Sequence, residues 1–475
     1  MSILIDINHH IYKFLGVFIV IKPIDKESSF LENEVFISST DLRGNITYAN
    51  DIFMRVSQFS KDEIINAPHS IIRHPDMPKT IFYLLWDFIK QGKVITAYVK
   101  NIAKDGSYYW VCATACPVFD KHGKADAYLS GRIKPTSKFF DLIPDLYAKI
   151  LACETSYPNE WQKRGVALLL ETLTTLGYSS YENFMEDIIE AEFTDKESTL
   201  IPNIDMSLYQ GSLNVHDLYT RTQDMYRQLQ QLTSYLSIFK ESLSAMAEHT
   251  DLINNALRQT RMSALNASIK SSQLAQEGKA FSIISKAIQE LSMKGNNMAN
   301  IVEYNVTTFQ TNLTEKEQIF VRTSLFKIIT ILIQCELKNY IEGRLDNLDF
   351  LTNSGKFLRF HMHIDELEAL LKPILFNASQ INLLSLELKA LSSSAKIESA
   401  RINSATFVAI IINIDQVVHL LDNSVKQFTA LNSKIGSALL ALDETFYKID
   451  LDSDQLAHVV ETQQNSLVLL EDSSL

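Results

Sequence analysis

The spacing of apolar residues changes twice along the chain. From about residue 35 to residue 134, short apolar runs alternate with turn-forming residues, a pattern that predicts strands joined by tight turns. From residue 138 to residue 211 the spacing is helical but is interrupted by Pro144, Pro158, Gly177 and Pro202. Beyond residue 211 it is helical almost without a break. The pattern predicts a mixed α and β domain, a helical connector and a long all-helical region.

The first region contains five predicted strands and one amphipathic helix. A turn at residues 41–45 joins the first two strands, a turn at 104–107 joins the third to the fourth, and a turn at 121–123 precedes the fifth. Between the two hairpins, Phe82, Leu85 and Ile89 lie on one side of a helix expected over residues 80–90. The strands are expected at residues 36–40, 46–49, 94–103, 108–118 and 127–133. They predict a five-stranded antiparallel sheet with flanking helices across one face.

The all-helical region carries apolar residues at alternating three- and four-residue steps, which is the spacing of a coiled coil. One stripe stops near Leu274 and another begins after Gly278, so the two arms are predicted to form an extended antiparallel hairpin. The first arm is marked by Leu229, Leu232, Leu236, Phe239, Leu243, Met246, Ile253 and Leu257, with Thr250 interrupting it, and the second by Phe281, Ile284, Ile288, Leu291, Met298, Val302 and Phe309. A second hairpin is predicted from an arm with Ile374, Ile381, Leu384, Leu388 and Leu391 and an arm with Phe407, Ile410, Ile414, Val417, Leu421, Phe428, Leu431, Ile435, Leu442 and Ile449.

Composition and charge narrow the classes of protein that fit. A chain of 475 residues is too long for one compact core, and its 14 Gly and 10 Pro favour long helices over a turn-rich all-β fold. The net charge of −12, with no cluster of Lys and Arg, argues against nucleic acid as a partner. The four cysteines are scattered and fit neither a redox pair nor a zinc site, so no metal site is predicted. Apolar runs at residues 14–21 and 325–333 are too short to span a bilayer, so no transmembrane segment and a cytoplasmic location are expected.

Residues 38–133 carry a specific string of residue types. The string contains Arg73-His74-Pro75-Asp76-Met77-Pro78, preceded by Tyr48-Ala49-Asn50-Asp51-Ile52-Phe53 and followed by Phe82, Trp86, Val99-Lys100-Asn101 and Tyr108-Tyr109-Trp110-Val111. In order, spacing and residue type it resembles the PAS domain of aerotaxis receptors. The resemblance implies a PAS fold that binds FAD. The cofactor contacts that it implies are Asn50, Arg73, His74, Asp76, Phe82, Trp86 and Asn101.

The chemistry of several of these side chains suits a flavin. Arg73 offers a fork of donors for a pyrophosphate or a ring carbonyl, and Phe82 and Trp86, one helical turn apart, can stack on a planar ring. A purely structural alternative pairs Arg73 with Asp76 across a proline-stiffened turn and places Trp86 in the core. No glycine-rich nicotinamide motif accompanies the segment, so the flavin is expected to report redox state rather than to catalyse a reaction, and no catalytic residue is predicted.

The predicted turn of the first hairpin lies between residues 259–269 and 277–284. These two segments resemble the tip of methyl-accepting chemotaxis proteins and align with it without a gap. Arg258, Lys270 and Gln273 stand where that family has an aromatic residue, a carboxylate and an arginine. The expected signalling tip consists of Leu265, Asn266, Lys270, Gln273, Gln276, Gly278, Phe281 and Ile283. The resemblance implies a homodimer, the assembly of such dimers into trimers, and binding to the chemotaxis kinase CheA and the coupling protein CheW. The three departures predict that this coupling is weakened.

These expectations combine into one functional prediction. The ranges are an N-terminal extension (1–34), a PAS sensor domain (35–137), a helical connector (138–211), a chemoreceptor-like signalling hairpin (212–312) and a C-terminal helical region with room for a second hairpin (313–475). The predicted protein is a cytoplasmic redox or energy sensor of the aerotaxis-receptor type, whose FAD-binding PAS domain transmits flavin redox state to a coiled coil in chemotaxis. The alternative is a PAS flavoprotein interaction module that signals to a non-chemotaxis partner. A flavin-dependent enzyme is the least favoured, because no substrate-side acid, base or nucleophile is apparent.

Overall fold

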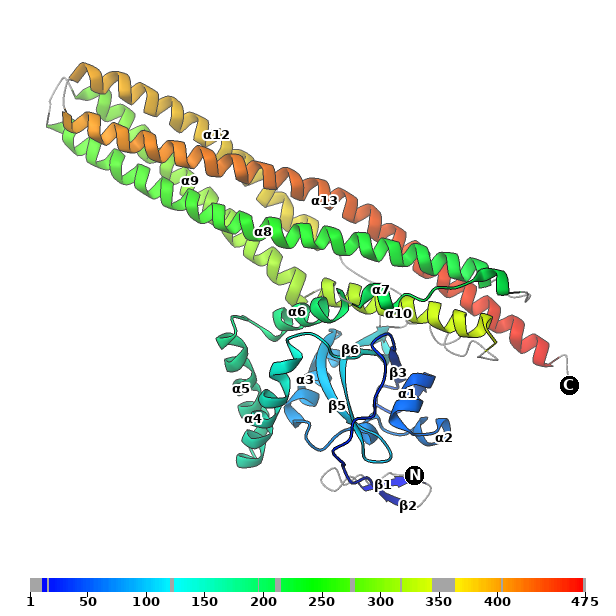
Figure 1. The fold of residues 1–475 in the computed structure, drawn as a ribbon. Coiled ribbons are helices and arrows are strands. Elements are labelled where there is room, and N and C mark those ends of the chain that lie inside the picture. The colour runs from blue at the N-terminus through cyan, green and yellow to red at the C-terminus, as the bar shows by residue number, and fades with distance from the viewer. Residues whose placement is uncertain are drawn as a thin grey trace. The chain divides into compact units, whose positions relative to one another are not determined.

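The computed structural model describes residues 11–14, 17–119, 124–194, 196–209, 215–273, 278–316, 318–343, 364–402 and 405–472. The chain divides into two compact units (Figure 1). The sensor unit comprises residues 1–231, 314–361 and 446–475, and the bundle unit comprises residues 232–313 and 362–445. These units cut across the ranges expected from the sequence, since the signalling hairpin and the C-terminal region each contribute to both.

The predicted α+β fold is confirmed in the sensor unit, where five antiparallel strands form one sheet in the order β4-β3-β7-β6-β5. The strands are β3 (Phe36–Thr40), β4 (Ile46–Ala49), β5 (Ile95–Ile102), β6 (Tyr108–Phe119) and β7 (Ala125–Ile133). Between β4 and β5 lie α1 (Asp51–Ser57), α2 (Lys61–Ile64), the 3-10 helix η1 (His69–Ile72) and α3 (Lys79–Lys90). The turn between β3 and β4 forms as its composition predicts, because the Asp41 carboxylate accepts hydrogen bonds from the backbone N–H groups of Arg43 and Asn45. A short hairpin that the sequence analysis did not predict, β1 (Ile11–Phe14) with β2 (Val17–Val20), comes before the sheet.

Two helices from the connector, α4 (Ile143–Ser156) and α6 (Tyr181–Thr194), cover the outer face of this sheet. Between them α5 (Trp161–Thr175) packs on α3 and α4, and α7 (Glu197–Leu200) follows α6. These helices begin or end near the prolines and the glycine that predict the breaks. The strand register sets Thr96, Thr114 and Gly131 in one row across β5, β6 and β7. The Tyr181 hydroxyl of α6 donates to the Thr96 carbonyl, and the Tyr147 hydroxyl of α4 donates to the Tyr98 carbonyl. Small side chains in the row therefore let helices approach the sheet closely.

A later helix, α10 (Ile319–Ile341), lies on the same face, although it follows the first hairpin in sequence. A Cβ atom at Gly131 would come within 3.2 Å of Ile328 Cγ2. Just before α10, the Gln318 amide accepts from the Val94 N–H at 2.6 Å and donates to the Val94 carbonyl at 2.7 Å. Lys327, inside the apolar run, is buried and pairs with Glu197 at 3.1 Å. The stretch Lys279–Ile341 is long and apolar enough to cross a membrane, and 83% of its most apolar window is buried within the protein.

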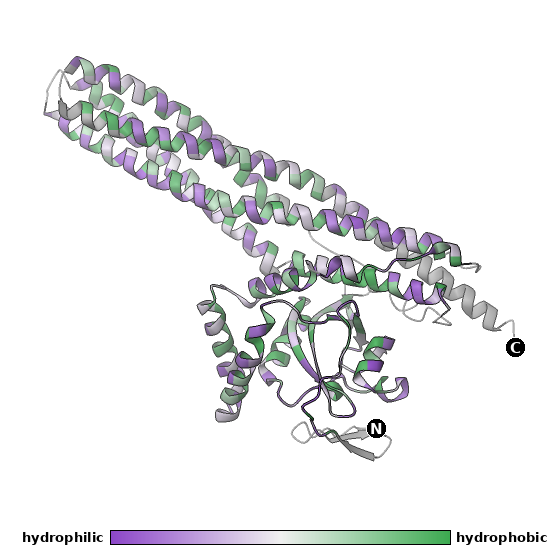
Figure 2. Ribbon diagram, viewed as in Figure 1, coloured by the Kyte–Doolittle hydropathy of each residue, from purple (hydrophilic) through white to green (hydrophobic). Residues whose placement is uncertain are grey.

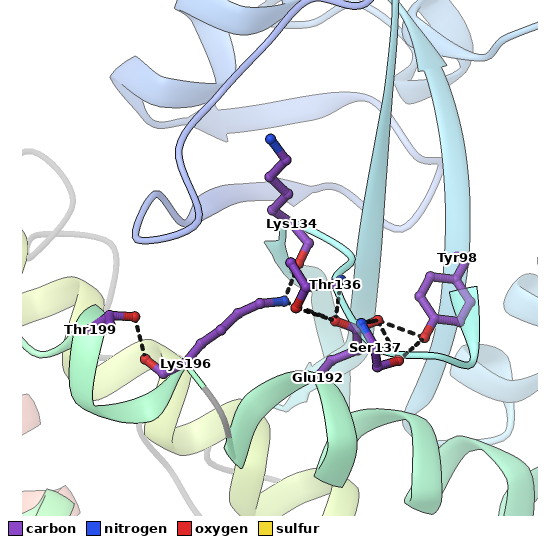
Figure 3. A network of polar contacts seen from close by, with 7 residues as sticks. All are labelled: Tyr98, Lys134, Thr136, Ser137, Glu192, Lys196 and Thr199. Atoms are coloured by element: carbon purple, nitrogen blue, oxygen red, sulfur yellow. Dashed lines mark hydrogen bonds and ion pairs between the residues drawn. The ribbon is translucent and has the colours of Figure 1, made fainter. Parts of the chain in front are cut away.

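A buried ionic network fastens α6 to the sheet (Figure 3). Glu192 accepts hydrogen bonds from the Tyr98 hydroxyl at 2.7 Å, from the Thr136 backbone N–H at 2.8 Å and from the Ser137 hydroxyl at 2.8 Å. Lys196 pairs with the same carboxylate at 2.8 Å and donates to the Lys134 carbonyl. Burial alone raises the pKa of Glu192, but Lys196 and the hydrogen bonds outweigh it and hold the pKa below its ordinary value. The carboxylate therefore remains charged in the folded state.

Four long helices build the bundle unit, and polar and apolar residues alternate along each of them (Figure 2). They come from α8 (Val215–Ser272), α9 (Lys279–Thr311), α12 (Ile364–Ile402) and α13 (Ala405–Asp472), and a short π-helical turn, Asn312–Lys316, follows α9. The rings of Phe239 in α8 and Phe309 in α9 lie 5.9 Å apart, as the predicted antiparallel hairpin requires. The second predicted hairpin, α12 with α13, packs in the same unit.

The seam of α9 differs from the predicted stripe. Ser285, Ser292 and Ala299 occupy fully buried positions, whereas Leu291 and Met298 are half-buried. Thr250 of α8, which interrupts the apolar pattern, is also fully buried because its hydroxyl donates to the Met246 carbonyl. A helix in a four-helix bundle contacts two neighbours, so its buried face includes small and hydrogen-bonded residues that apolarity alone does not mark.

The Glu192 network predicts a large loss of stability on neutralisation. Glu192→Gln leaves the buried Lys196 ammonium without its carboxylate, which we expect to lower the free energy of unfolding of the sensor unit by about 3–5 kcal/mol at neutral pH. Because the folded-state pKa of Glu192 is lowered, its contribution is present above about pH 4.3 and is lost as the pH falls further. Urea titration followed by tyrosine and tryptophan fluorescence measures both effects.

The matched control is Glu160→Gln, just before α5; Glu160 forms an exposed pair with Arg164 at 2.6 Å. This substitution should change stability little, since water already solvates both charges. Equal effects of the two substitutions would show that burial of the Glu192 pair does not determine its contribution.

Candidate cofactor site

A cavity of about 240 Å³ lies between the inner face of the sheet, η1 and α3. The sheet contributes small and polar side chains to it, and α3 contributes large apolar ones. The lining residues are Ser38, Thr40, Arg43, Gly44, Pro68, His69, Ser70, Ile72, Arg73, Phe82, Leu85, Trp86, Ile89, Val99, Asn101, Ala113, Ala115, Tyr128, Leu129, Ser130 and Arg132. A chamber with one apolar wall and a few convergent polar groups is typical of a site for a small aromatic ligand.

Four of the seven predicted contacts, Arg73, Phe82, Trp86 and Asn101, line this cavity. The Arg73 guanidinium lies 4.1 Å from the centre of the Phe82 ring, and it donates to the Met77 carbonyl at 3.3 Å. The sequence offered an ion pair between Arg73 and Asp76 as a structural alternative. This pair is not among the ion pairs of the described residues, and Asp76 pairs with Lys100 instead.

The indole of Trp86 occupies space that a side chain at Gly44 would fill. Gly44 has a φ of +84°, which favours glycine, and a Cβ atom there would lie 2.9 Å from Trp86 Cη2. The indole contacts the Tyr128 ring edge to face at 5.6 Å between ring centres. Trp86 therefore forms a wall of the cavity that is held from two sides.

The other three predicted contacts lie outside the cavity lining. Asn50 is buried and binds backbone: its amide donates to the Val35 carbonyl and accepts from the N–H groups of Ile37 and Phe53. The buried His74 ring accepts from the Asp76 N–H at 3.1 Å. Asp76 itself is 60% exposed and pairs with Lys100 at 2.6 Å. In this structure the three residues stabilise the segments around the cavity, and their contact with a cofactor stays a prediction.

Two cavity residues were missed by the sequence analysis. Arg132 is buried in β7, and it donates to the Ser38 hydroxyl at 3.0 Å and to His69 Nε2 at 2.6 Å. Among the described residues no carboxylate pairs with Arg132. Burial lowers the pKa of Arg132 to about 10, so the guanidinium stays charged at neutral pH. The period-two pattern Tyr128, Ser130, Arg132 in a buried strand is the signal that could have revealed it.

His69 is the neutral acceptor for this buried charge. Burial, and after it the positive charge of Arg132, lower the pKa of His69 to about 3. Since an arginine can only donate, Nε2 of the imidazole accepts and carries no proton. Of the three arginines that line the cavity, Arg132 is the buried one, and its nearest partners are neutral.

Two buried polar atoms of the cavity residues lack a hydrogen-bond partner: Asn101 Nδ2 and Arg132 Nη1. Leaving a buried donor unpaired is costly, so such atoms usually have a ligand or water in the native protein. A flavin fits this donor set, because its ring presents carbonyl oxygens and ring nitrogens at one edge and flat apolar faces to Phe82 and Trp86. The described residues contain no cluster of three His, Cys, Asp or Glu side chains that could hold a metal ion.

The predicted signalling-tip residues divide between surface and core. Leu265, Asn266, Lys270, Gln273 and Ile283 are exposed, with Ile283 at 72%, whereas Phe281 is buried in the seam. Gly278 is buried at the turn, where a Cβ atom would lie 2.1 Å from the Ser271 carbonyl oxygen. Gln276 lies outside the described residues. The exposed residues are placed to contact a partner, and their role in coupling stays a prediction.

The neutral His69 predicts a pH dependence of stability. In the unfolded state the imidazole is protonated below about pH 6.5, whereas in the folded state it stays neutral down to about pH 3. Between these two values the free energy of unfolding therefore falls by about 1.4 kcal/mol for each pH unit as the pH is lowered. His69→Gln keeps an acceptor for Arg132 but cannot titrate. The stability of the wild type relative to this variant should fall between pH 6.5 and pH 5, as measured by urea unfolding.

His419→Gln in α13 serves as the control, because that ring is 70% exposed. It should leave the pH dependence of sensor-unit stability as it is in the wild type. A parallel pH dependence of the wild type and His69→Gln would contradict a neutral, buried His69.

The comparisons with known proteins agree with this fold. A family model described as "PAS fold" matches residues 46–130. The aerotaxis receptor of Escherichia coli is 34% identical over 158 residues, which cover 29% of this chain and 31% of that protein. The biofilm dispersion protein BdlA of Pseudomonas aeruginosa is 22% identical over 253 residues, which cover 53% of this chain and 50% of that protein. The chain thus spans about a third to a half of the length of these relatives.

Among solved structures, a light-oxygen-voltage domain studied with a flavin analogue aligns at 20% identity, over 26% of this chain and 87% of that chain, with a TM-score of 0.21. The expected resemblance to aerotaxis receptors is confirmed by the relative from Escherichia coli. Residues 46–130 are a PAS domain, and the chain is homologous to the aerotaxis receptor and to BdlA.

Proposed function

We propose that this protein is a cytoplasmic redox or energy sensor in which the PAS cavity binds FAD and transmits its redox state to the helical bundle. The observation that carries the proposal is the pair of unpartnered buried donors, Asn101 Nδ2 and Arg132 Nη1, beside the apolar wall of Phe82 and Trp86. When bound, a flavin supplies reversible electron uptake. The homology to the aerotaxis receptor supports the same cofactor, and none of these residues forms a substrate-side acid–base pair, so we propose a sensor rather than an enzyme.

Arg132 has a specific role in this proposal. A positive charge in a low-dielectric site favours any ligand state that carries more negative charge, and Coulomb interactions are strong there because little water screens them. Arg132 is held in place by Ser38 and by the neutral His69, and no ion pair with a carboxylate among the described residues offsets its charge. The site therefore favours electron uptake by a bound flavin.

The turn between α3 and β5 connects the cavity to helix α10 and could carry a structural change from one to the other. That turn joins the helix of Phe82 and Trp86 to the strand of Asn101, and it is bonded to α10 by Gln318 at Val94 and by Arg322, which donates to the Gly92 carbonyl at 2.9 Å. Helix α10 follows α9 in the chain after a short π-helical turn. A shift of α3 against β5 would therefore pull on the segment that leaves the first hairpin.

The partner proposed for the output is the chemotaxis machinery of CheA and CheW, in keeping with the homology to chemotaxis-type sensors. A partner outside chemotaxis is the second candidate, and the observation that favours it is the surface position of Arg258, Lys270 and Gln273. These three departures from the chemoreceptor tip are exposed, so they change the contact surface without disturbing the core. The predicted homodimer is not tested by a single chain and stays a prediction.

Flavin binding is the first prediction of this proposal. The purified protein, supplied with FAD, should show the two-band absorption of oxidised flavin, and acid should release FAD rather than FMN. Trp86→Ala should lower the flavin content severalfold, because it removes a wall of the cavity. Arg132→Met should lower the flavin content and the midpoint potential of the flavin that remains, because it removes the positive charge.

Tyr83→Ala is the matched control, since Tyr83 lies on the same helix but packs on Trp161 outside the cavity, at 6.2 Å between ring centres. It should retain wild-type flavin content. A well-folded wild-type protein that stays colourless after incubation with FAD would refute the proposal.

Coupling at the tip is the second prediction. Losing one partner of a desolvated interfacial charge pair costs about 2–5 kcal/mol, and losing both costs less because no charge is left unpaired. Here Lys270 and Gln273 replace both partners, so the attraction of the pair is lost and binding of CheW to the native tip should be weak. The triple substitution Arg258→Phe, Lys270→Glu and Gln273→Arg restores the chemoreceptor residue types at exposed positions. It should raise CheW affinity about tenfold or more by calorimetry with little change in thermal stability. Strong binding by the native tip, with no gain on restoration, would contradict this reading of the substitutions.

A further inference from the structure

We infer that the α12–α13 hairpin is an internal counterpart of the α8–α9 hairpin and takes the place of a second subunit, so that one chain builds a complete signalling bundle. The inference concerns the bundle unit alone and does not depend on whether the cavity binds a flavin. Four observations support it: the register of the two hairpins, the contacts between them, the complementary sizes of their core residues and the closure of the seam.

The two hairpins reach their turns in the same register. Residues 267–271 and 395–399, at the ends of the two first arms, share the sequence Ala-X-Ile-X-Ser. In both segments the alanine and the serine are buried and the isoleucine is exposed. Beyond each turn, the aromatic Phe281 corresponds to Phe407 in a turn that is two residues shorter. A common heptad spacing would align the stripes of any two coiled coils, but it does not require the turns to coincide as well.

The contacts between the hairpins have the form that a two-fold axis produces. A Cβ atom at Gly295 in α9 would lie 3.1 Å from Leu384 Cδ2 in α12, and Lys434 Nζ in α13 lies 4.0 Å from Glu241 Oε2 in α8. In both cases the second arm of one hairpin meets the first arm of the other. Two-fold symmetry requires this reciprocity, because a contact between one pair of elements must recur between the exchanged pair.

The core side chains of the two second arms are complementary in size. At corresponding positions α9 carries small residues where α13 carries large ones, and all are buried. The pairs are Ser292 with Val418, Gly295 with Leu421, and Ala299 with Val425. Two α8–α9 hairpins packed on each other would therefore lack the volume that α13 supplies and would leave cavities in the seam.

The seam is also closed within one chain. The core residues Leu243, Met246 and Leu257 of α8 and Ile374, Ile381 and Leu388 of α12 are each at most 1% exposed in the single chain. A second copy could not reach them without opening the bundle. It follows that the bundle presents one α8–α9 tip per chain, with Leu265 and Ile283 exposed once rather than twice.

Chemical cross-linking of the full chain tests the inference. Glu241→Cys and Lys434→Cys replace two exposed residues of α8 and α13, within reach of a short bismaleimide. In the double variant we expect the cross-link to form within one chain, giving a product with the mass of a single chain of 54.0 kDa. Co-expression of the two single variants, with distinguishable tags, should give no more cross-linked dimer than the wild type, whose own cysteines provide the background.

A double variant within the second hairpin, Lys396→Cys with Asp415→Cys, is the positive control, because these side chains are 2.5 Å apart in α12 and α13 and must cross-link within one chain in either arrangement. Cross-linked dimer from the mixed single variants would show that a second copy of this chain supplies α13, by domain exchange or as a separate subunit, and would overturn the inference. Failure of the double variant to cross-link within the chain, while the positive control reacts, would overturn it as well.

Discussion

The outer face of the PAS sheet has to be covered, and most of the remaining architecture depends on how the chain covers it. Thr96, Thr114 and Gly131 form a row too small to be an interface by itself, but one on which helices can lie closely. The connector supplies α4 and α6, and the rest comes from α10, which is reached only after the first hairpin has been built. The edge of the sheet needs partners as well. The backbone N–H and carbonyl of Val94, beside the edge strand β5, form their hydrogen bonds with Gln318. The sensor unit is therefore assembled from segments that are far apart in sequence.

Two of the buried charges in the sensor unit, Glu192 and Arg132, are partnered in opposite ways. Glu192 has a full set of partners: Lys196, the backbone and hydroxyl donors of Thr136 and Ser137 just after β7, and Tyr98. Arg132 has only neutral partners and one unpartnered nitrogen in a cavity. A fully paired charge rigidifies the fold, since each member would be costly to leave alone. A charge with spare hydrogen-bonding capacity is the arrangement expected where a ligand completes the set. The difference separates a structural network on one face of the sheet from the proposed cofactor site on the other.

The bundle unit meets a similar requirement with apolar packing. A hairpin of two helices leaves one face of each arm uncovered, and a closed core needs a further pair. This chain contains both pairs. At corresponding core positions, α9 carries small residues and α13 carries large ones. Because α10 separates the pairs in sequence and belongs to the sensor unit, the chain between the hairpins is attached to the PAS sheet. The covering of the sheet and the closing of the bundle are thus linked through one continuous segment.

By itself the sequence determined the local elements and their chemical character. The five strands and α3 were predicted to within about two residues, because turn residues and the period of the side chains are properties of neighbouring positions. Phe82, Trp86, Arg73 and Asn101 were found in the same way, as a string of suitable residue types, and they meet in one cavity. Asn50, His74 and Asp76 belong to the same string, but the structure uses them to hold backbone or surface partners.

Only the tertiary structure decided what depends on distant partners. The neutrality of His69 follows from burial and from its 2.6 Å contact with the positive charge of Arg132, a residue far away in the chain. The apolar run of α10 had the same appearance in sequence as any buried helix, and its place on the sheet depends on Gly131 and Val94, about two hundred residues earlier. The seam of α9 passes through Ser285 and Ser292 because two neighbouring helices, not one, press against it. Spacing along a chain records which face of an element is apolar, whereas the identity of the neighbour, and with it charge state and register, is set by contacts that no local pattern contains.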